Sequence, residues 1–428
     1  MKKIILLGLL TTTASVVLAQ KDGPPIKASE AERIEKVLAA DDMKGRRVFT
    51  PELDKAAAFI AAEFKKAGLQ TAKDNGSFLQ EFVMVRPKFI SASGQLDGKP
   101  IPQKNIVVIS SQPDLKMDDH SGYEKATIKA GANLFMEAYK LVQSGASYFV
   151  TVDTSFSKNF GRLAQFKSGG IFKSDKSIVF ILAEREPATY SIEAKQQLTE
   201  QKLANVVGIL PGKSKKDEYV IFSGHYDHIG IGQPVNGDSI NNGANDDAAG
   251  TTAVIMLASY FKALGNNERT LVFAAFTAEE IGGYGSQYFS KQFEPSKVAA
   301  LFNIEMIGTE SKWGKNSAYI TGYEKTDMGP ILQKNLEGTG FTFYPDPYPD
   351  QQLFYRSDNA TLARLGVPAH TISTSKMDNE PNYHKVSDQV ESLDLDNMVM
   401  IIKSVALSAK GIIAGTETPT RVNVQELR

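Results

Sequence analysis

The sequence predicts an α/β protein in which helices flank a mostly parallel, mixed sheet, with a smaller α+β module inserted into it. From about residue 205 onward, short apolar runs alternate with long helical patterns, which is typical of buried parallel strands covered on both faces. Between about 86 and 198, shorter β-type runs alternate with polar loops rich in Gly, Asp, Ser and Lys. A chain of 428 residues also exceeds one ordinary compact core. We therefore expect a main domain formed by 20–85 and 199–428, and an inserted module at 86–198.

The first 19 residues predict a secretory signal peptide. Lys2 and Lys3 precede an apolar stretch that ends in small residues at Ala19. This stretch is shorter than the roughly 20 apolar residues that a membrane-spanning helix needs. We expect cleavage after Ala19 and a secreted or periplasmic protein that is not attached to a membrane after cleavage.

The main domain begins with two expected helices around the loop GRRVFTPE at 45–52. Apolar residues recur at helical spacing in 34–38 and again in 57–64, and Gly68 is a suitable C-terminal stop. The two expected helices therefore pack on the surface of the sheet.

The second half supplies the rest of the sheet and its helices. Strands are expected at 219–222, 271–276, 300–304 and 367–372, and helices at 248–264, 285–289 and 397–413. In the inserted module, strands are expected at 105–109 and 177–182. Since ligands of open α/β sheets bind at the carboxyl ends of strands, the residues that follow these strands are candidates for a functional site.

Composition excludes several classes of protein. Lys and Arg number 48 against 49 Asp and Glu, so there is no basic surplus for a general nucleic-acid binder. The chain has no cysteine, which excludes disulfides, thiolate nucleophiles and cysteine-bound zinc. Any metal must therefore bind to histidine and carboxylate side chains.

Two of the five histidines lie in GHYDHIG at 224–230, directly after an expected buried strand. His225 is the candidate metal ligand, and Asp227 can hold the peptide or imidazole of that ligand. We expect His228 to be a loop residue that lines the cleft rather than a metal ligand, and His120 to lie in an exposed loop.

Acidic residues follow the next expected strand and begin the next expected helix. In GANDDAAG, Asp247 can cap the helix, whereas Asp246 is free to face a cleft. In TAEEIGG, Glu279 and Glu280 follow an apolar strand, where an unpaired carboxylate is costly, so we expect one to be a ligand and the other a base.

Glu305 ends the strand at 300–304, and His384 lies in the segment NYHKVSD. Taken one at a time, these residues have ordinary structural explanations. Together, two imidazoles and three carboxylates fit a pair of divalent ions, and such nitrogen and oxygen ligands suit zinc.

The motifs GHYDHIG, GANDDAAG, TAEEIGG, NIEMIG and NYHKVSD, in this order, resemble those of the co-catalytic dizinc exopeptidase family. That family includes bacterial leucyl aminopeptidases, aminopeptidase Y and glutamate carboxypeptidase II. The resemblance covers about 200–428 and, more loosely, 30–70. It implies a zinc exopeptidase fold of the phosphorylase/hydrolase-like type. The position of the insertion resembles that of a protease-associated domain, a small β-rich lid.

The resemblance also implies roles for individual residues. Asp246 would bridge two zinc ions, with Glu279 as general base and Asp227 as the residue that orients His225. The remaining ligands would be His225 and Glu305 for one ion, and Glu280 and His384 for the other. The family usually has Asp at the position of Glu305, and often His at the position of Asn359, to which we assign no catalytic role.

An exported zinc exopeptidase that acts on peptides is the function this resemblance implies, and an aminopeptidase is favoured. Two other enzymes stay open: a glutaminyl-peptide cyclase, which has the same fold and uses one zinc, and a carboxypeptidase of the same family. A non-enzymatic binding module would be expected to have lost ligands or the base, and here all are present. Side-chain preference, the physiological substrate and oligomeric state are not predicted.

Overall fold

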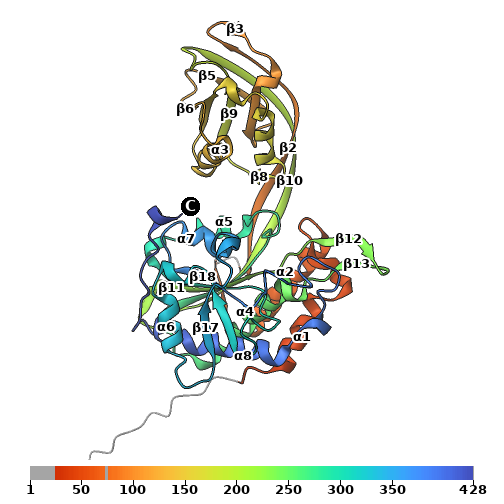
Figure 1. Ribbon diagram of the computed structural model, residues 1–428, viewed down its shortest axis with the longest axis vertical. Helices are drawn as coiled ribbons and strands as arrows, with labels where there is room; N and C mark the ends of the chain where they lie inside the picture. Colours follow the sequence, from red (N-terminus) through yellow and green to blue (C-terminus); the bar gives the residue numbers. More distant parts are fainter. Residues whose placement is uncertain (1–24, 73–75, 428) are drawn as a thin grey trace, which may run out of the picture.

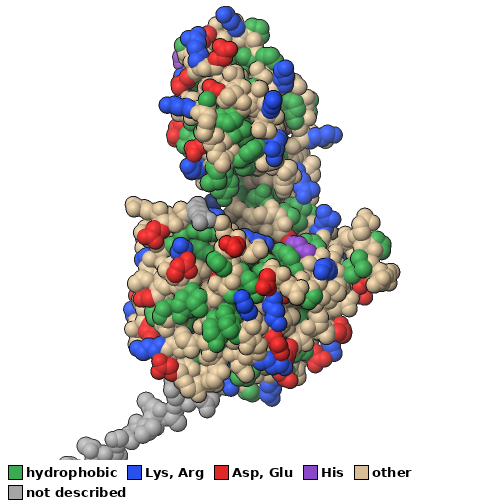
Figure 2. Space-filling model, in the orientation of Figure 1, with side chains coloured by type: hydrophobic (Ala, Val, Ile, Leu, Met, Phe, Trp, Pro, Cys, Tyr) green, Lys and Arg blue, Asp and Glu red, His purple; other side chains and the backbone are tan. Residues whose placement is uncertain are grey.

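A computed structural model describes residues 25–72 and 76–427, so the expected signal peptide lies outside the described residues. A larger body carries the central sheet and most helices, and a smaller module stands above it on two long strands (Figure 1). Figure 2 shows that the surface is hollowed between the module and the body. Within the described ranges, the helices all lack the length and apolar character required to cross a membrane.

The central sheet has the strand order β17-β16-β18-β15-β11-β14-β10-β2-β3. Its middle four strands are parallel: β11 (Lys215–His225), β14 (Arg269–Phe276), β15 (Val298–Ile304) and β18 (Ala369–Ser373). At one side, β16 (Ser317–Ile320) runs antiparallel to β18, and β17 (Thr342–Pro345) runs parallel to β16. The prediction of a mostly parallel, mixed sheet is confirmed.

Helices cover both faces of this sheet. Successive residues of a strand point to opposite faces, and in β11 Phe222 belongs to one apolar cluster and Ile221 to another. The cluster around Phe222 is covered by α1 (Ala28–Leu38), α2 (Pro51–Lys66), α4 (Ala249–Leu264), α6 (Met328–Lys334), α8 (Leu395–Ser408) and α9 (Lys410–Ile413). The cluster around Ile221 is covered by α5 (Tyr284–Ser290) and α7 (Asn359–Ala363). The single helix expected at 397–413 is divided at Ala409 into α8 and α9.

The strands that carry the module are β2 (Leu79–Leu96) and β10 (Tyr190–Leu210). They pair antiparallel along nearly their whole length, with an irregularity between Lys195 and Gln196. The module boundaries expected at 86 and 198 fall within this continuous ladder. The two parts of the chain are therefore joined by paired strands rather than by loop linkers.

The module contains its own sheet, in the order β4-β9-β7-β6. These strands are β4 (Ile106–Ser110), β9 (Ser177–Leu182), β7 (Tyr148–Val152) and β6 (Glu124–Ile128), and α3 (Leu134–Gln143) packs against them. The shorter strands elsewhere are β1 (Gln70–Thr71), β3 (Lys99–Pro100), β5 (Asp114–Asp118), β8 (Ile171–Phe172), β12 (Gly230–Val235) and β13 (Asp238–Asn241). The expected strands at 105–109 and 177–182 are present, and they are antiparallel neighbours.

Candidate metal centre

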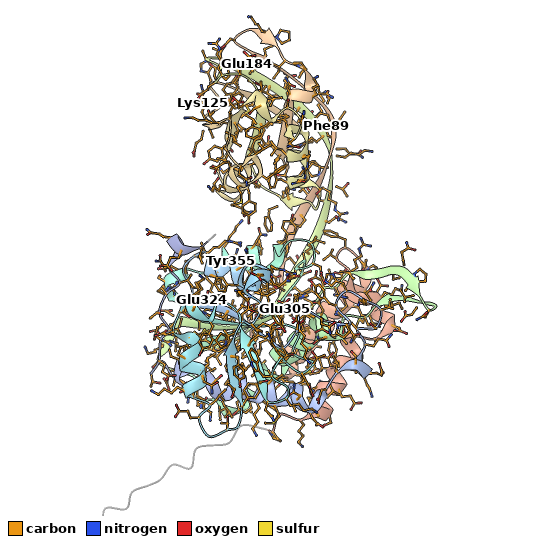
Figure 3. All side chains as sticks on the ribbon, in the orientation of Figure 1. Phe89, Lys125, Glu184, Glu305, Glu324 and Tyr355 are labelled. Carbon is orange, nitrogen blue, oxygen red and sulfur yellow. The ribbon has the colours of Figure 1, made fainter. Side chains whose placement is uncertain are left out.

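The expected site residues meet at the carboxyl edge of the parallel sheet. β11 ends at His225, β15 ends one residue before Glu305, and Glu279 and Glu280 lie in the turn after β14. Because β11, β14 and β15 are adjacent and parallel, their ends lie side by side. Figure 3 shows Glu305 near the centre of the body.

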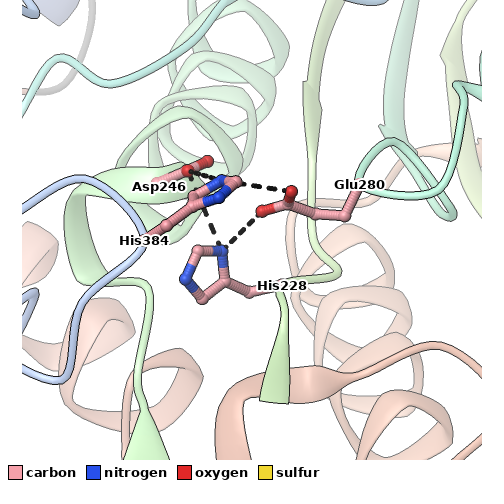
Figure 4. A group of neighbouring side chains, drawn as sticks. All are labelled: His228, Asp246, Glu280 and His384. Carbon is pink, nitrogen blue, oxygen red and sulfur yellow. Dashed lines mark hydrogen bonds and ion pairs between the residues drawn. The ribbon is translucent and has the colours of Figure 1, made fainter. Parts of the chain in front are cut away.

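Two groups of potential ligands share one residue. Each residue in a group offers one nitrogen or oxygen atom, and these atoms lie within 4.8 Å of one another. The first group contains His225, Asp246 and Glu305, and the second contains His228, Asp246, Glu280 and His384 (Figure 4). Asp246 is therefore positioned between two sets of donor atoms.

The separations between these donor atoms fit tetrahedral zinc. His384 Nε2 is 3.2 Å from both Asp246 Oδ2 and Glu280 Oε2, and His225 Nε2 is 3.3 Å from Asp246 Oδ1. Two ligands at about 2.1 Å from one ion in tetrahedral geometry are about 3.4 Å apart. The spacing therefore suits atoms that face a common cation.

Several of these atoms are also buried without a hydrogen-bond partner. They are His225 Nε2, Asp246 Oδ2 and Glu305 Oε2. Buried polar atoms are normally paired, because desolvation without a compensating bond is costly. A divalent ion would satisfy them, so the residues fit the expected metal.

The position of His228 differs from the prediction that it lines the cleft. Its side chain is fully buried, and its Nδ1 lies 2.7 Å from Glu280 Oε1 and 3.9 Å from Asp246 Oδ2. The backbone turn after β11 directs this ring inward beneath Glu280. The spacing of three residues between His225 and His228 is visible in the sequence, but the direction of the His228 side chain depends on the fold.

Asp227 makes a contact different from the expected one. Its carboxylate accepts hydrogen bonds from the backbone N–H groups of Glu279 (3.1 Å) and Glu280 (3.3 Å). The ring Nδ1 of His225 lies 3.1 Å from the backbone carbonyl oxygen of Asp227 and 3.9 Å from its carboxylate. The carboxylate of Asp227 thus fixes the turn that carries the two glutamates, while its carbonyl holds His225.

Asp247 precedes Ala248, the N-cap residue of α4, and its carboxylate connects the first turn of this helix to two strand ends. Its carboxylate accepts hydrogen bonds from the N–H groups of Gly250 (2.9 Å), His225 (3.1 Å) and Met306 (3.0 Å). A Cβ at Gly250 would lie 2.0 Å from the carbonyl oxygen of Ile304, so only glycine lets the helix approach β15 so closely. This close approach brings the start of α4 to the metal centre.

Sequence reasoning missed two residues that hold the ligand loops. Asp388 accepts hydrogen bonds from the N–H groups of Asn245 (2.7 Å) and Asp246 (3.0 Å). Its position in NYHKVSD, four residues after His384, was a possible signal.

Arg46 is the second residue, and it is fully buried. It donates to the backbone carbonyls of Tyr226, Leu38, Asn242 and Gly243 at 2.6–2.8 Å. The loop GRRVFTPE therefore connects the segments that precede Asp246 and follow His225.

Burial and like charges dominate the electrostatics of the site. Burial, together with the nearby Glu305, Asp358 and Glu280, holds the pKa of Glu279 well above its ordinary value. Burial likewise raises the pKa of Glu305 to about 7. Burial acts in the same direction on Asp246, but its contacts with His225 and His384 prevail and lower its pKa. A site so rich in carboxylates favours a cation.

An open pocket lies over these residues. Glu279 lines it together with Tyr319, Leu353, Arg356 and Tyr383. Asn359 lies away from it, because its amide donates to the carbonyls of Phe354 (3.0 Å) and Ala369 (3.3 Å), which is a structural role. His120 lies in an exposed turn far from the site in sequence, as expected.

Fold and site together define a class: an α/β protein with two groups of histidine and carboxylate donors at the carboxyl edge of its sheet. The sequence profile of peptidase family M28 matches residues 205–409. Over this segment the chain is similar to peptidase family M28, in agreement with the family that the motifs predict.

One relative by sequence agrees with this similarity. A probable leucine aminopeptidase of Trichophyton verrucosum is 29% identical over 204 residues, which cover 46% of this chain and 53% of the relative. The chain thus matches about half the length of that curated relative.

Solved structures show the same fold. A zinc aminopeptidase from Bacillus subtilis is 18% identical, with a TM-score of 0.54 over 91% of this chain and 95% of that chain. Glutaminyl cyclase from Porphyromonas gingivalis is 12% identical, with a TM-score of 0.50 over 90% of this chain and 99% of that chain. The fold alone therefore does not separate the two activities.

Proposed function

We propose that this protein is a zinc-dependent aminopeptidase that removes N-terminal residues from peptides. The observation that carries the proposal is the shared position of Asp246 between two groups of donor atoms. His225 and Glu305 would complete the ligands of one zinc ion, and Glu280 and His384 those of the other. His228 would hold Glu280 through its 2.7 Å contact.

Two divalent ions in this arrangement would polarise the scissile carbonyl and lower the pKa of a bound water. Glu279 is suited to act as the general base, because it lines the pocket and belongs to neither donor group. Its carboxylate would take a proton from the attacking water and pass it to the leaving amine. Asp227 would keep the base in position through the backbone of the turn.

Two alternative enzymes have weaker support. A cyclase of this fold that uses one zinc would have no need for a second set of donors around Asp246. A carboxypeptidase would use the same centre with the opposite substrate polarity. The aminopeptidase name of the curated relative supports the amino polarity.

The experiment compares matched substrates with a free or an acetylated N-terminus, together with the zinc content of the protein. We expect two zinc ions per chain, hydrolysis of leucine p-nitroanilide and of free peptides, no cleavage of acetylated substrates, and loss of turnover after chelation. At most one zinc together with ammonia release from N-terminal glutamine would favour the cyclase. Release of C-terminal residues from acetylated peptides would favour the carboxypeptidase.

Export is part of the same proposal. The basic and apolar segment at 1–19 supports a cleavable signal peptide. N-terminal sequencing of the protein recovered from its native compartment should begin at Gln20. A protein that retains residues 1–19 would contradict this proposal.

A further inference from the structure

A second cavity lies between the inserted module and the body. On the module side it is lined by Tyr139 and Gln143, which are four residues apart and share one face of α3. On the body side it is lined by Gln287 of α5 and by Lys291 and Arg364, which follow α5 and α7. Figure 2 shows this hollow, and Tyr355, another lining residue, lies near the top of the body in Figure 3.

This cavity adjoins the pocket over the metal ligands. Glu279, Arg356 and Ser357 line both the pocket over the ligands and the second cavity. At the other end, Tyr139 and Lys291 also line a third cavity beneath the module. The cavities therefore lie next to one another from Glu279 to the module.

The module is held against the body where this path runs. The Tyr284 hydroxyl donates to the carbonyl of Gly170 (2.9 Å). The ring of Phe172 packs edge-on against Tyr284, with 5.6 Å between ring centroids. Because β8 also pairs with β2, both sides of the cavity are parts of one connected structure.

The residues that line these cavities carry an excess of positive charge. Beyond Glu279, the charged residues that line the two cavities are Lys176, Lys291, Arg356 and Arg364. No carboxylate of the described residues accompanies them there, although acids and bases are nearly equal in the whole chain. Lys176 has an acidic partner, Asp175, at 3.7 Å.

The other three cations have no acidic partner within 4.0 Å among the described residues. Arg356 donates to the side-chain oxygen of Gln351 (3.2 Å), and Lys291 lies over the ring of Phe172 at 4.8 Å from its centroid. Unpaired cations that face one hollow attract carboxylates and repel ammonium groups.

Apolar side chains line the same cavity. Tyr139 is 39% exposed and Leu365 is 47% exposed, from the module and the body respectively. Large apolar side chains that remain exposed in a cavity can bury the side chains of a ligand. The lining thus combines apolar contact area with excess positive charge.

We propose that this cavity binds the part of a peptide substrate that follows the scissile bond, and that Lys291 and Arg364 select peptides with a free C-terminal carboxylate there. This inference rests on the proposed aminopeptidase function. In that polarity the free N-terminus occupies the metal pocket, and the carboxylate end extends toward the cations. In the opposite polarity an ammonium group would face them.

The test uses the full chain loaded with zinc and short leucine peptides of two to five residues, each with a free or an amidated C-terminus. We expect a roughly three- to tenfold higher kcat/KM for the free acid at the preferred length, since two partly exposed ion pairs give effects of this order. The difference should shrink in high salt, because the charges are screened.

The decisive variant is the double substitution Lys291→Gln and Arg364→Gln, with Lys403→Gln as control. Lys403 is exposed on α8, which covers the opposite face of the sheet. The double variant should lose the preference for the free acid while its turnover of leucine p-nitroanilide, which has no distal carboxylate, stays unchanged. The control should keep both properties.

Equal kcat/KM for free and amidated peptides in the wild type would overturn this inference but not the proposed function. A preference for the free acid that persists in the double variant would have the same consequence. Failure of the wild type to hydrolyse leucine p-nitroanilide would overturn the proposed function and this inference with it.

Discussion

Glu279 and Glu280 are neighbours in the sequence, but they occupy different chemical positions. Glu280 contacts His228 (2.7 Å) and His384 (3.2 Å) and belongs to a donor group. Glu279 belongs to neither donor group and lines the pocket. Both N–H groups donate to Asp227, so one turn positions both carboxylates beside the pocket, and of the two only Glu280 joins a donor group.

The variants Glu279→Gln and Glu280→Gln should therefore fail in different ways. Glu279→Gln keeps the side-chain volume and removes the proposed base, so we expect two zinc ions and a loss of about 10²–10⁴ in kcat. Glu280→Gln should lose occupancy of one ion, since a neutral amide is a poorer zinc ligand. Elemental analysis and turnover of the same preparations measure both effects. Metal loss in Glu279→Gln with full occupancy in Glu280→Gln would show that the roles are exchanged.

A substitution at Asp388 tests whether a residue that holds the backbone of a ligand loop affects zinc affinity. Asp388→Asn removes one of the two oxygens that accept from Asn245 and Asp246. We expect zinc affinity to fall about 10–100-fold, the usual effect of losing a group that orients a ligand. Zinc titration should show that excess metal restores turnover. Asp350→Asn, at an exposed position, is the control, and unchanged affinity in Asp388→Asn would contradict this prediction.

At the scale of elements, α1 packs against α4 and α8 with a glutamate in the contact. Glu35 is buried, and burial raises its pKa to about 8. The folded protein therefore favours the protonated form, whereas the unfolded chain has an ordinary carboxyl. Its contribution to stability is fully present below the ordinary carboxyl pKa and decreases as the pH rises to about 8.

We predict that Glu35→Gln makes the protein less sensitive to pH. Between the ordinary carboxyl pKa and about pH 8, the wild type should lose stability by up to about 1.4 kcal/mol per pH unit from this group. Urea unfolding at pH 5, 6, 7 and 8, with zinc held constant, measures the slope. Glu32→Gln on the same helix is the matched control. A variant with the wild-type slope would show that Glu35 does not titrate in this range.

At the scale of the whole molecule, the site collects acids from distant parts of the chain. The carboxylates in or beside it are Asp227, Asp246, Asp247, Glu279, Glu280, Glu305 and Asp358. Burial raises the pKa of both Asp227 and Glu305 to about 7. Without divalent ions, these carboxyl groups ionise as the pH rises, and the resulting carboxylates repel one another.

Removal of metal should therefore destabilise the protein, and more strongly at pH 8 than at pH 6. The sign follows from raised carboxyl pKa values, because the metal-free protein loses stability as the pH passes through about 7. Thermal unfolding with and without chelator at both pH values measures the effect, and added zinc should restore the Tm. Equal Tm values with and without chelator would contradict the expected metal centre.

The sequence by itself determined the four parallel strands of the central sheet, the residue types at their ends and the resemblance to a family. Buried parallel strands are continuous apolar runs, so the runs at 271–276 and 300–304 correspond closely to β14 (Arg269–Phe276) and β15 (Val298–Ile304). The acidic residues that follow these two strands are equally visible in the sequence.

Only the tertiary structure decided how these residues are held. Asp388 binds the backbone of Asp246 across 142 positions, and Arg46 reaches Gly243 across 197. His228 turns inward to Glu280, and the ladder of β2 and β10 passes through the expected module boundaries. Local patterns record which residues are apolar or charged along one segment. They contain no information on which distant backbone groups meet, because that depends on how the elements pack.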